Sequence, residues 1–266
     1  YPSFEGLFSL LFSSSSRLLM FLRLVGLIYL FAFASFYVQS EGLYGDEGIL
    51  PLNNKFGTSD LSHGPFSELL LRFLQQPNLL LFRSLLSFSS AFDLADFLCL
   101  LGSFCSSILA LNLSSHLLFS FLPYVCYLSL FLSGQTFLSF QWDILLLEVG
   151  FASCFFSWIL VPSSPLRPVN HASVLFWVRS IAFKLLFMAG IVKLTSQCQT
   201  WSQITALEYH FATQCIPNTF SWFAHQLHPF LLRLGVGATL YIEIPLAFLL
   251  VVPFTPLRRV SVVCQA

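Results

Sequence analysis

The sequence predicts an all-α, polytopic helical membrane protein with about six transmembrane helices, and three observations lead to that prediction. Hydrophobic residues make up 56% of the 266 positions and charged residues only 9%, so polar side chains are too few to cover a water-soluble surface of this size. The 32 phenylalanines and many leucines occur in long runs, and the mean hydropathy is +0.80. Twelve Lys and Arg balance twelve Asp and Glu, which favours no nucleic-acid partner. The lipid bilayer is therefore the expected surrounding of the chain.

Six apolar runs approach or exceed the length of about 20 residues that a transmembrane helix needs. The first run is too long for a secretory signal and has no small-residue cleavage site before Gln39, so we expect it to be a retained anchor. The second and third runs are close enough to predict a tight hairpin through Asn112 and His116. The predicted spans are Leu18 to Val38, Phe97 to Leu113, Leu117 to Ser133, Phe137 to Leu160, Val174 to Val192 and Leu231 to Val252.

The positions of Lys and Arg near the helix ends predict the orientation of the spans. With six spans, three basic pairs fall on one side, which we expect to be the cytosol; they are Arg17 with Arg23, Arg167 with Arg179, and Arg258 with Arg259. Residues 1–16 then form an N-terminal tail, and residues 17–266 form a transmembrane domain with loops of about 39–80 and 195–230 on the opposite face. Three basic residues in the first of these loops weaken the assignment, although long loops count little: Lys55, Arg72 and Arg83.

One segment leaves an alternative topology open. Leu79 to Phe92 is apolar but interrupted by Arg83 and serines, which favours a helix at the membrane interface over a span. A span in this segment would reverse the orientation of everything that follows it. In the six-span topology the sequon at Asn112 faces the cytosol, so we expect it to carry no glycan.

Five ionisable residues lie within or beside the predicted spans, where a charge is costly unless it is paired or faces protein or water. They are Asp143, Glu148, Lys184, Lys193 and Glu243. Helical spacing places Asp143 and Glu148 on different faces, and the same holds for Lys184 and Lys193. We expect pairing between helices, for example of Glu148 with Lys184, while Lys193 extends to the interface. A functional role for these charges is the alternative.

The predicted loop 195–230 contains two cysteines, Cys198 and Cys215. A disulfide between them is the favoured interpretation, and it would stabilise the loop by about 3 kcal/mol in the chain-entropy model. Two free thiols are the alternative. Cys264, beside basic residues, could be palmitoylated. The remaining cysteines lie in apolar runs, where they behave as small hydrophobic residues: Cys99, Cys105, Cys126 and Cys154.

Motifs of familiar enzymes are missing from the sequence. There is no G-x-S-x-G elbow, no P-loop and no dinucleotide-binding fingerprint, so we expect a protein that is not an enzyme and has no cofactor. Zinc needs clustered ligands, and the spacing of His210, Cys215, His225 and His228 provides none, so we expect no metal.

Several blocks of the sequence resemble the lipase maturation factors, and most strongly the type 2 branch of that family. The longest block runs from Val192 to Trp201 and continues through Thr205 to His210, Thr213 to Cys215 and Trp222 to Leu227. Ala212 stands where the family usually has an acidic residue, and His228 interrupts a usual Leu-Pro. Further similar blocks are Ala32 to Ser35, Gly42 to Gly45, Gly48 to Pro51, Phe140 to Asp143, Leu145 to Glu148, Glu243 to Pro245 and Pro256 to Arg259.

The resemblance implies a protein of the endoplasmic reticulum membrane that helps secreted lipases of the lipoprotein lipase type to fold, assemble into dimers and leave the compartment. It also implies that loop 195–230 faces the lumen and that the family's C-terminal lumenal domain is absent from this chain. We expect that loop to contact the client through aromatic and histidine side chains. An aromatic belt at the membrane surface is an equal alternative. The residues are Trp201, Tyr209, His210, Phe220, Trp222 and His225.

A second, shorter resemblance keeps an enzyme in consideration. The run from Gly190 to Leu194, followed by Trp201, is faintly similar to the membrane region of vitamin K-dependent carboxylases, in which a lysine next to this position acts as a base. In this alternative Lys193 is the base of a membrane-embedded carboxylase, and it would need to lose its proton.

Overall fold

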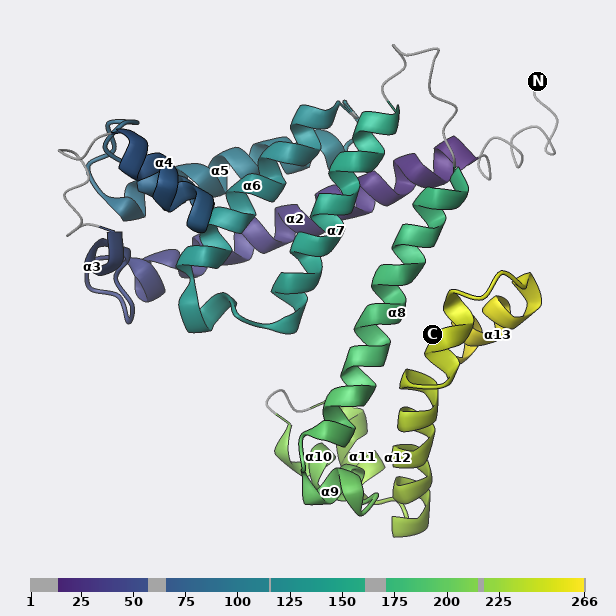
Figure 1. Ribbon diagram of the computed structural model, residues 1–266. Helices are drawn as coiled ribbons and strands as arrows, with labels where there is room; N and C mark the ends of the chain where they lie inside the picture. Colours follow the sequence, from purple (N-terminus) through teal and green to yellow (C-terminus); the bar gives the residue numbers. More distant parts are fainter. Residues whose placement is uncertain (1–13, 57–65, 115, 161–170, 215–217, 266) are drawn as a thin grey trace. The chain divides into compact units, whose positions relative to one another are not determined.

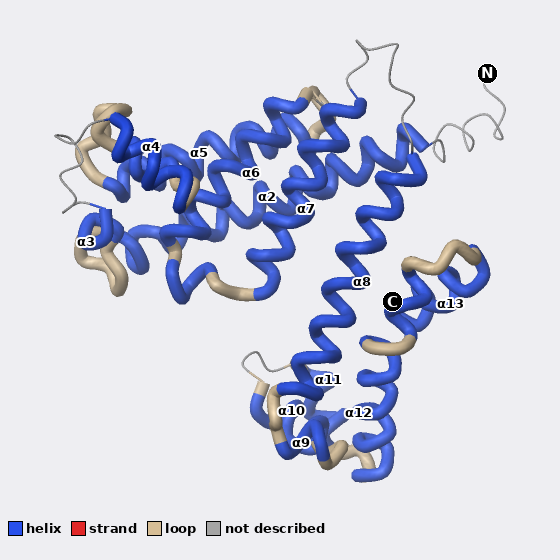
Figure 2. Tube along the Cα trace, viewed as in Figure 1, coloured by secondary structure: helices blue, strands red, loops and turns tan. Residues whose placement is uncertain are grey.

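A computed structural model describes residues 14–56, 66–114, 116–160, 171–214 and 218–265. These residues form helices and turns and contain no strand (Figures 1 and 2). The chain divides into two compact units, residues 1–171 and residues 172–266. The all-α class that the sequence predicts is confirmed.

Four long helices build the first unit. Helix α2 (Ser14–Tyr44) packs along α5 (Ala91–Ala110), α5 packs against α6 (Leu117–Ser133), and α7 (Gln141–Leu160) contacts both α6 and α2. The approach of α2 to α5 is close because a glycine lies between them. A Cβ at Gly102 would lie 2.3 Å from Cζ of Phe33, a ring that is completely buried. The core includes Val25, Tyr29, Phe33, Leu94, Leu98, Tyr127 and Leu130.

The segment between α2 and α5 packs at one end of these helices. It contains α3 (Leu52–Phe56), α4 (Phe66–Gln75) and the 3-10 helix η2 (Leu79–Phe82). Leu80 of η2 is buried, and the side chain of Asn78 donates a hydrogen bond to Oγ of Ser133 at 2.8 Å. Residues 79–92 therefore contain η2, a turn at 83–87 and the start of α5, with η2 packed on α6. They form neither one continuous interfacial helix nor an additional span.

Helix ends differ from the predicted spans where side chains cap the backbone. Helix α5 begins at Ala91, before the predicted start at Phe97, because Ser90 and Asp93 form a capping box. In it, the Asp93 N–H donates to Oγ of Ser90 at 2.9 Å and the Ser90 N–H donates to Oδ2 of Asp93 at 3.1 Å. The hairpin between α5 and α6 forms as predicted, with Asn112 at a positive φ of 57° that asparagine tolerates.

The second unit contains two long helices joined by three short ones. Helix α8 (His171–Thr195) leads into a three-helix segment, which consists of α9 (Gln199–Ser202), α10 (Ala206–Thr213) and α11 (Thr219–His225). Helix α12 (Pro229–Glu243) then packs on α10 and meets α8 near its own C-terminal end.

The sixth predicted span is interrupted by a proline. Helix α12 ends at Glu243, and Pro245 follows, which disfavours helical geometry in the preceding residue, Ile244. The chain continues as the 3-10 helix η4 (Leu246–Leu250) and then as α13 (Thr255–Gln265). A run of apolar residues cannot reveal such a break by its length alone.

Four segments within the described part of the chain are long and apolar enough to cross a membrane: Leu18–Tyr44, Ala91–Ala110, Leu175–Thr195 and Pro229–Leu250. Helix α6 is apolar but has 17 residues, which is at the lower limit for a span. Helix α7 has 20 residues and begins at Gln141, after the 3-10 helix η3 (Gln135–Leu138). Each predicted span thus contains a helix, and the chain is a polytopic helical membrane protein.

Candidate functional site

The second unit brings together two of the predicted intramembrane charges, Lys193 and Glu243. Nζ of Lys193, near the end of α8, donates hydrogen bonds to Oε1 of Glu243 at 2.7 Å and to Oε2 at 2.6 Å. A further hydrogen bond from Nζ reaches the carbonyl oxygen of Ala189 at 3.3 Å. The two side chains are 21% and 17% exposed, so each charge has a partner where solvent is scarce. Lys193 is thus paired with a carboxylate of α12, and its predicted position at the membrane interface stays a prediction.

Small and aromatic residues allow the two helices to meet at this pair. A Cβ at Gly190 would lie 2.5 Å from Cγ1 of Ile244, so only glycine permits the close approach of α8 to the end of α12. Three rings then join α8 to η4, with centroids 5.0 to 5.3 Å apart: Phe183, Phe187 and Phe248. The packing of α8 against Ile244 and against η4 therefore holds the ion pair in place.

Trp201 connects the ion pair to the three-helix segment. Nζ of Lys193 lies 5.3 Å from the centroid of the Trp201 ring, within the distance at which a cation is attracted by an aromatic face. The Trp201 side chain is half-buried in this position. Trp201 therefore attaches α9 to the end of α8, and its contact with a client stays a prediction.

The three-helix segment is held to α12 by apolar and charged contacts. Arg233 of α12 pairs with Glu208 of α10, with Nε 3.2 Å from Oε1. A Cβ at Gly235 would lie 2.8 Å from Cδ1 of Leu207, which shows how closely α10 and α12 approach. Asn218 and Ser221 form a capping box at the start of α11. The described parts of the predicted loop, residues 195–214 and 218–230, thus form a folded helical structure.

Most of the predicted contact residues are exposed on this structure. Tyr209, Phe220 and Trp222 are 57%, 80% and 63% exposed, and His210 and His225 are exposed as well. We call the exposed rings of α10, α11 and the start of α12 the aromatic cap; they are Tyr209, Phe220, Trp222, Phe223 and Phe230. The sequence analysis did not name Phe223 and Phe230. The sequence could have indicated Phe223, because it directly follows the predicted contact residue Trp222. In the structure the two rings are in contact.

Cys198 is exposed at the N-cap of α9. Its Sγ lies 3.1 Å from Oγ1 of Thr200. Hydrogen bonds from the Thr200 hydroxyl and from the backbone N–H groups of Thr200 and Trp201 lower the pKa of the Cys198 thiol. Cys215 lies outside the described residues, so the disulfide between the two stays a prediction.

The remaining predicted charges lie elsewhere in the fold. Glu148 belongs to α7 of the first unit and Lys184 to α8 of the second, so their pairing stays a prediction. Asp143 is buried at the start of α7 and accepts hydrogen bonds from the Tyr127 hydroxyl at 2.8 Å and from the Phe140 N–H at 3.2 Å.

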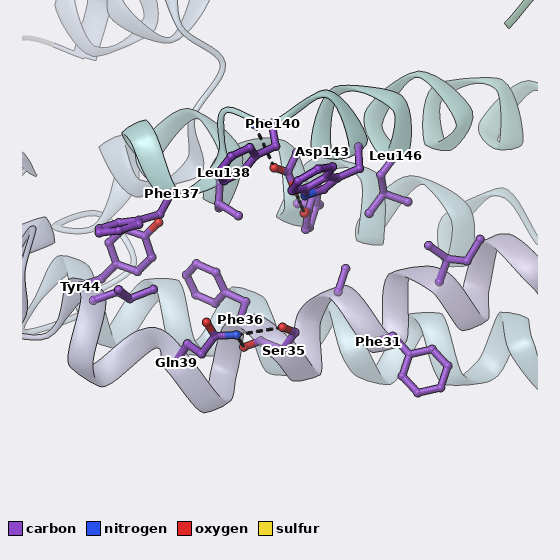
Figure 3. Close-up of a pocket in the computed structure, with 15 residues that line it drawn as sticks. Phe31, Ser35, Phe36, Gln39, Tyr44, Phe137, Leu138, Phe140, Asp143 and Leu146 are labelled. Carbon is purple, nitrogen blue, oxygen red and sulfur yellow. Dashed lines mark hydrogen bonds between the residues drawn. The ribbon is translucent and has the colours of Figure 1, made fainter. Parts of the chain in front are cut away.

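Asp143 lines a pocket of about 460 Å³ between α2 and α7 of the first unit. Figure 3 shows Phe140 and Asp143 on one wall of the pocket and Ser35, Phe36 and Gln39 on the facing wall. The sequence analysis found Asp143 but not its neighbours on α2, because contacts between helices are not visible in the spacing of one segment. A group of three or more His, Cys, Asp or Glu side chains able to hold a metal ion does not occur among the residues with described positions.

Fold and site together define a polytopic membrane protein whose exposed aromatic residues are carried on a folded segment between two apolar helices. Comparison with known proteins identifies the family. The family model described as the lipase maturation factor transmembrane domain matches residues 16–266, and the chain belongs to the lipase maturation factor family.

Individual relatives agree with this assignment and with the predicted type 2 branch. The chain is 43% identical to lipase maturation factor 2 of Xenopus laevis over 249 residues, which are 90% of this chain and 33% of that protein. It is 40% identical to the human lipase maturation factor 2 over 257 residues, 90% of this chain and 34% of the relative. Lipase maturation factor 1 of Mus musculus is 26% identical over 232 residues, 86% of this chain and 39% of the relative. The chain thus spans about a third of the length of the type 2 relatives. No solved structure matches it.

Proposed function

We propose that this protein acts in the endoplasmic reticulum membrane in the maturation of secreted lipases, and that its aromatic cap contacts the folding client. The family and its relatives carry the first part, since they are named for lipase maturation. One structural observation carries the second: a folded helical segment outside the long helices exposes several large rings instead of burying them. Exposed aromatic residues of this kind are the usual anchors of protein interfaces.

The position of the aromatic cap supports contact with a secreted client. Under the positive-inside rule, Arg17 and Arg23 near the start of α2 and the basic residues after η4 favour the cytosol at those ends. Residues 195–230 follow the C-terminal end of α8 and then face the lumen, where a secreted lipase folds. The ion pair of Lys193 with Glu243 and the packing of α10 on α12 hold the cap in one arrangement, which lowers the entropy cost of binding.

Lipase secretion tests this proposal. A cell line without its own maturation factors would express the protein together with a lipase of the lipoprotein lipase type, and the active lipase in the medium would be measured. Replacing Phe220 and Trp222 by Ala removes two exposed rings without opening a core, so the protein should stay folded. We expect the secreted active lipase to fall at least fivefold.

Phe104→Ala is the matched control. Phe104 of α5 is 64% exposed, as the rings of the cap are, but it lies in an apolar helix of the first unit. This variant should secrete lipase at the wild-type level. Wild-type secretion by the double variant would exclude a client role for the cap. Strong quenching of Trp222 fluorescence by brominated lipids would support an aromatic belt in the membrane instead.

The geometry of Lys193 bears on the carboxylase-like alternative. Its three hydrogen bonds, two to Glu243 and one to Ala189, use all three N–H groups of an ammonium. A catalytic base needs a free lone pair in reach of its substrate. The arrangement therefore favours a structural role for Lys193 and supports a function without catalysis.

A further inference from the structure

The pocket between α2 and α7 contains a buried carboxylate without an ionic partner. Asp143 is 5% exposed, and its two oxygens accept hydrogen bonds from the Tyr127 hydroxyl and the Phe140 N–H. Within the part of the chain that the structure describes, Asp143 forms no ion pair with Lys, Arg or His. A carboxylate has about four acceptor positions, so two stay free. A buried charge in a membrane protein normally has a partner or a function.

Five aromatic rings, from both walls, line the same pocket as this carboxylate. Phe140 and Trp142 of one wall are stacked with centroids 4.7 Å apart. Phe36 and Tyr44 of α2 are stacked at 5.4 Å, and Phe137 lies edge-on against Tyr44 at 6.0 Å. All five residues line the pocket. Several rings around one negative charge form the environment that binds an alkylated ammonium group through cation–π and Coulomb attraction.

The pocket is also long, and exposed apolar side chains of α2 lie at one of its ends. Its lining on α2 extends from Ile28 to Tyr44, about 24 Å at the rise of an α-helix, and half of a bilayer with its headgroups measures about 20–22 Å. At the Ile28 end the lining is apolar, and Ile28 and Phe31 are exposed side chains of a membrane-spanning candidate. The polar groups Ser35, Gln39 and Asp143 lie between Phe31 and Tyr44, and the rings of Tyr44 and Phe137 form the opposite end (Figure 3).

A hydrogen bond joins α2 to α7 near the Ile28 end of the pocket. The hydroxyl of Tyr29 donates to the carbonyl oxygen of Leu146 at 3.1 Å, and the absence of a side chain at Gly150 leaves room for that hydroxyl. On the other side of this contact, Gln39 donates two hydrogen bonds to Ser35, to its carbonyl oxygen and to its Oγ. The Ser35 hydroxyl accepts one of them and can donate its own proton to a phosphate or ester oxygen.

We propose that this pocket binds a phosphatidylcholine molecule of the bilayer, with the trimethylammonium group between Asp143 and the aromatic rings and an acyl chain along α2 toward Ile28. The carboxylate selects a headgroup with a cationic end and disfavours headgroups that are only anionic. The rings favour the methylated ammonium, and the α2 lining from Ser35 to Ile28 offers about 10 Å of mostly apolar surface to an acyl chain. A basic peptide would match the charge but would leave the apolar end of the pocket unfilled. The lipid site does not depend on the proposed function in lipase maturation.

Photocrosslinking tests this site. The full chain would be placed in nanodiscs that contain phosphatidylcholine with a diazirine in one acyl chain, and labelled peptides would be identified by mass spectrometry. We expect label on residues 28–39 and 140–146, and competition by unlabelled phosphatidylcholine but not by phosphatidylglycerol at the same mole fraction. Asp143→Asn removes the charge and keeps the shape, so the label should fall at least tenfold.

Two further variants make the result specific. Asp96→Asn removes another half-buried carboxylate, which binds Ser40 and does not line the pocket, so its label should equal that of the wild type. Ser35→Phe places a ring in the pocket from an exposed position and leaves Asp143 intact, and it should also lose the label. If Asp143→Asn does not fold, Ser35→Phe alone tests the lipid site. Wild-type labelling of both pocket variants, equal competition by phosphatidylglycerol, or displacement of the lipid by an oligolysine peptide would each overturn the proposal.

Discussion

Nζ of Lys193 in α8 lies within 2.7 Å of both carboxylate oxygens of Glu243, the last residue of α12, although 50 residues separate the two in the sequence. The ring of Trp201 covers the ammonium group from the side of α9. One ion pair thus joins the three segments that border the aromatic cap. The free energy of this contact should determine whether α9 to α11 keep their position beside α8.

Removing one charge should destabilise the second unit more than removing both. Lys193→Met leaves the Glu243 carboxylate without a partner, and Glu243→Gln does the same to the ammonium. We expect each single variant to lower the free energy of unfolding by about 2–3 kcal/mol, since the pair is mostly but not fully buried. The double variant should lose only about 1 kcal/mol, less than either single variant, because it leaves no buried charge without a partner. Reversible unfolding in mixed detergent micelles measures all three.

The same variants separate the structural role of Lys193 from a catalytic one. A structural role predicts that the double variant recovers lipase secretion in parallel with stability. A base in carboxylation would be missing from both variants that lack Lys193, so secretion or carboxylation that stays low in a stable double variant would contradict the structural assignment.

The contact of α2 with α5 predicts opposite effects of one substitution at two glycines. Gly102→Ala places a methyl group 2.3 Å from the buried Phe33 ring, so we expect a loss of about 1–3 kcal/mol from overpacking. Gly42→Ala in α2 meets no atom within 4 Å and should stabilise the helix by up to about 1 kcal/mol. The free energy of unfolding in micelles measures both. A stabilised Gly102→Ala would show that α2 and α5 are farther apart than in the structure.

The sequence predicted the helices well because the length of an apolar run is a local property. It placed α6 at Leu117–Ser133, and the structure has the same residues. It did not predict that Glu243 is the partner of Lys193, because 50 residues of intervening structure determine that contact. The break at Pro245 and the early start of α5 depend on single residues, a proline and a capping serine, whose effects disappear in an average over 20 residues. Asp143 was recognised as costly, but its partner Tyr127 belongs to α6, and Phe36 and Tyr44 of the same pocket belong to α2.

The early start of α5 predicts a local effect at Ser90. Ser90→Ala removes the hydroxyl that accepts the Asp93 N–H, while the Asp93 carboxylate can still accept from the backbone at position 90. We expect a loss of about 1 kcal/mol. Hydrogen exchange should rise in the first turn of α5, measured by mass spectrometry on peptides from residues 88–98. Ser89→Ala is the control, because Ser89 also contacts Asp93 but is not the N-cap of the helix. An equal effect of the two variants would argue against the capping box.

Cys198 gives a prediction that depends on its redox state. If the predicted disulfide with Cys215 forms in the lumen, the protein should migrate faster on a gel without reductant, and Cys198→Ser and Cys215→Ser should both abolish the shift.

After reduction, the hydrogen bonds from Thr200 and Trp201 keep the pKa of the Cys198 thiol below its ordinary value, so the thiolate forms at a lower pH than in an unperturbed cysteine. Alkylation by iodoacetamide should therefore reach its half-maximal rate at a lower pH in the wild type than in Thr200→Val, which removes the first of these donors. Both would be compared in a background with Cys264→Ser and Cys215→Ser, since Cys264 is the other exposed thiol among the described cysteines. Identical pH profiles would show that the Thr200 hydroxyl does not bond the sulfur, and α9 would then begin in a different conformation.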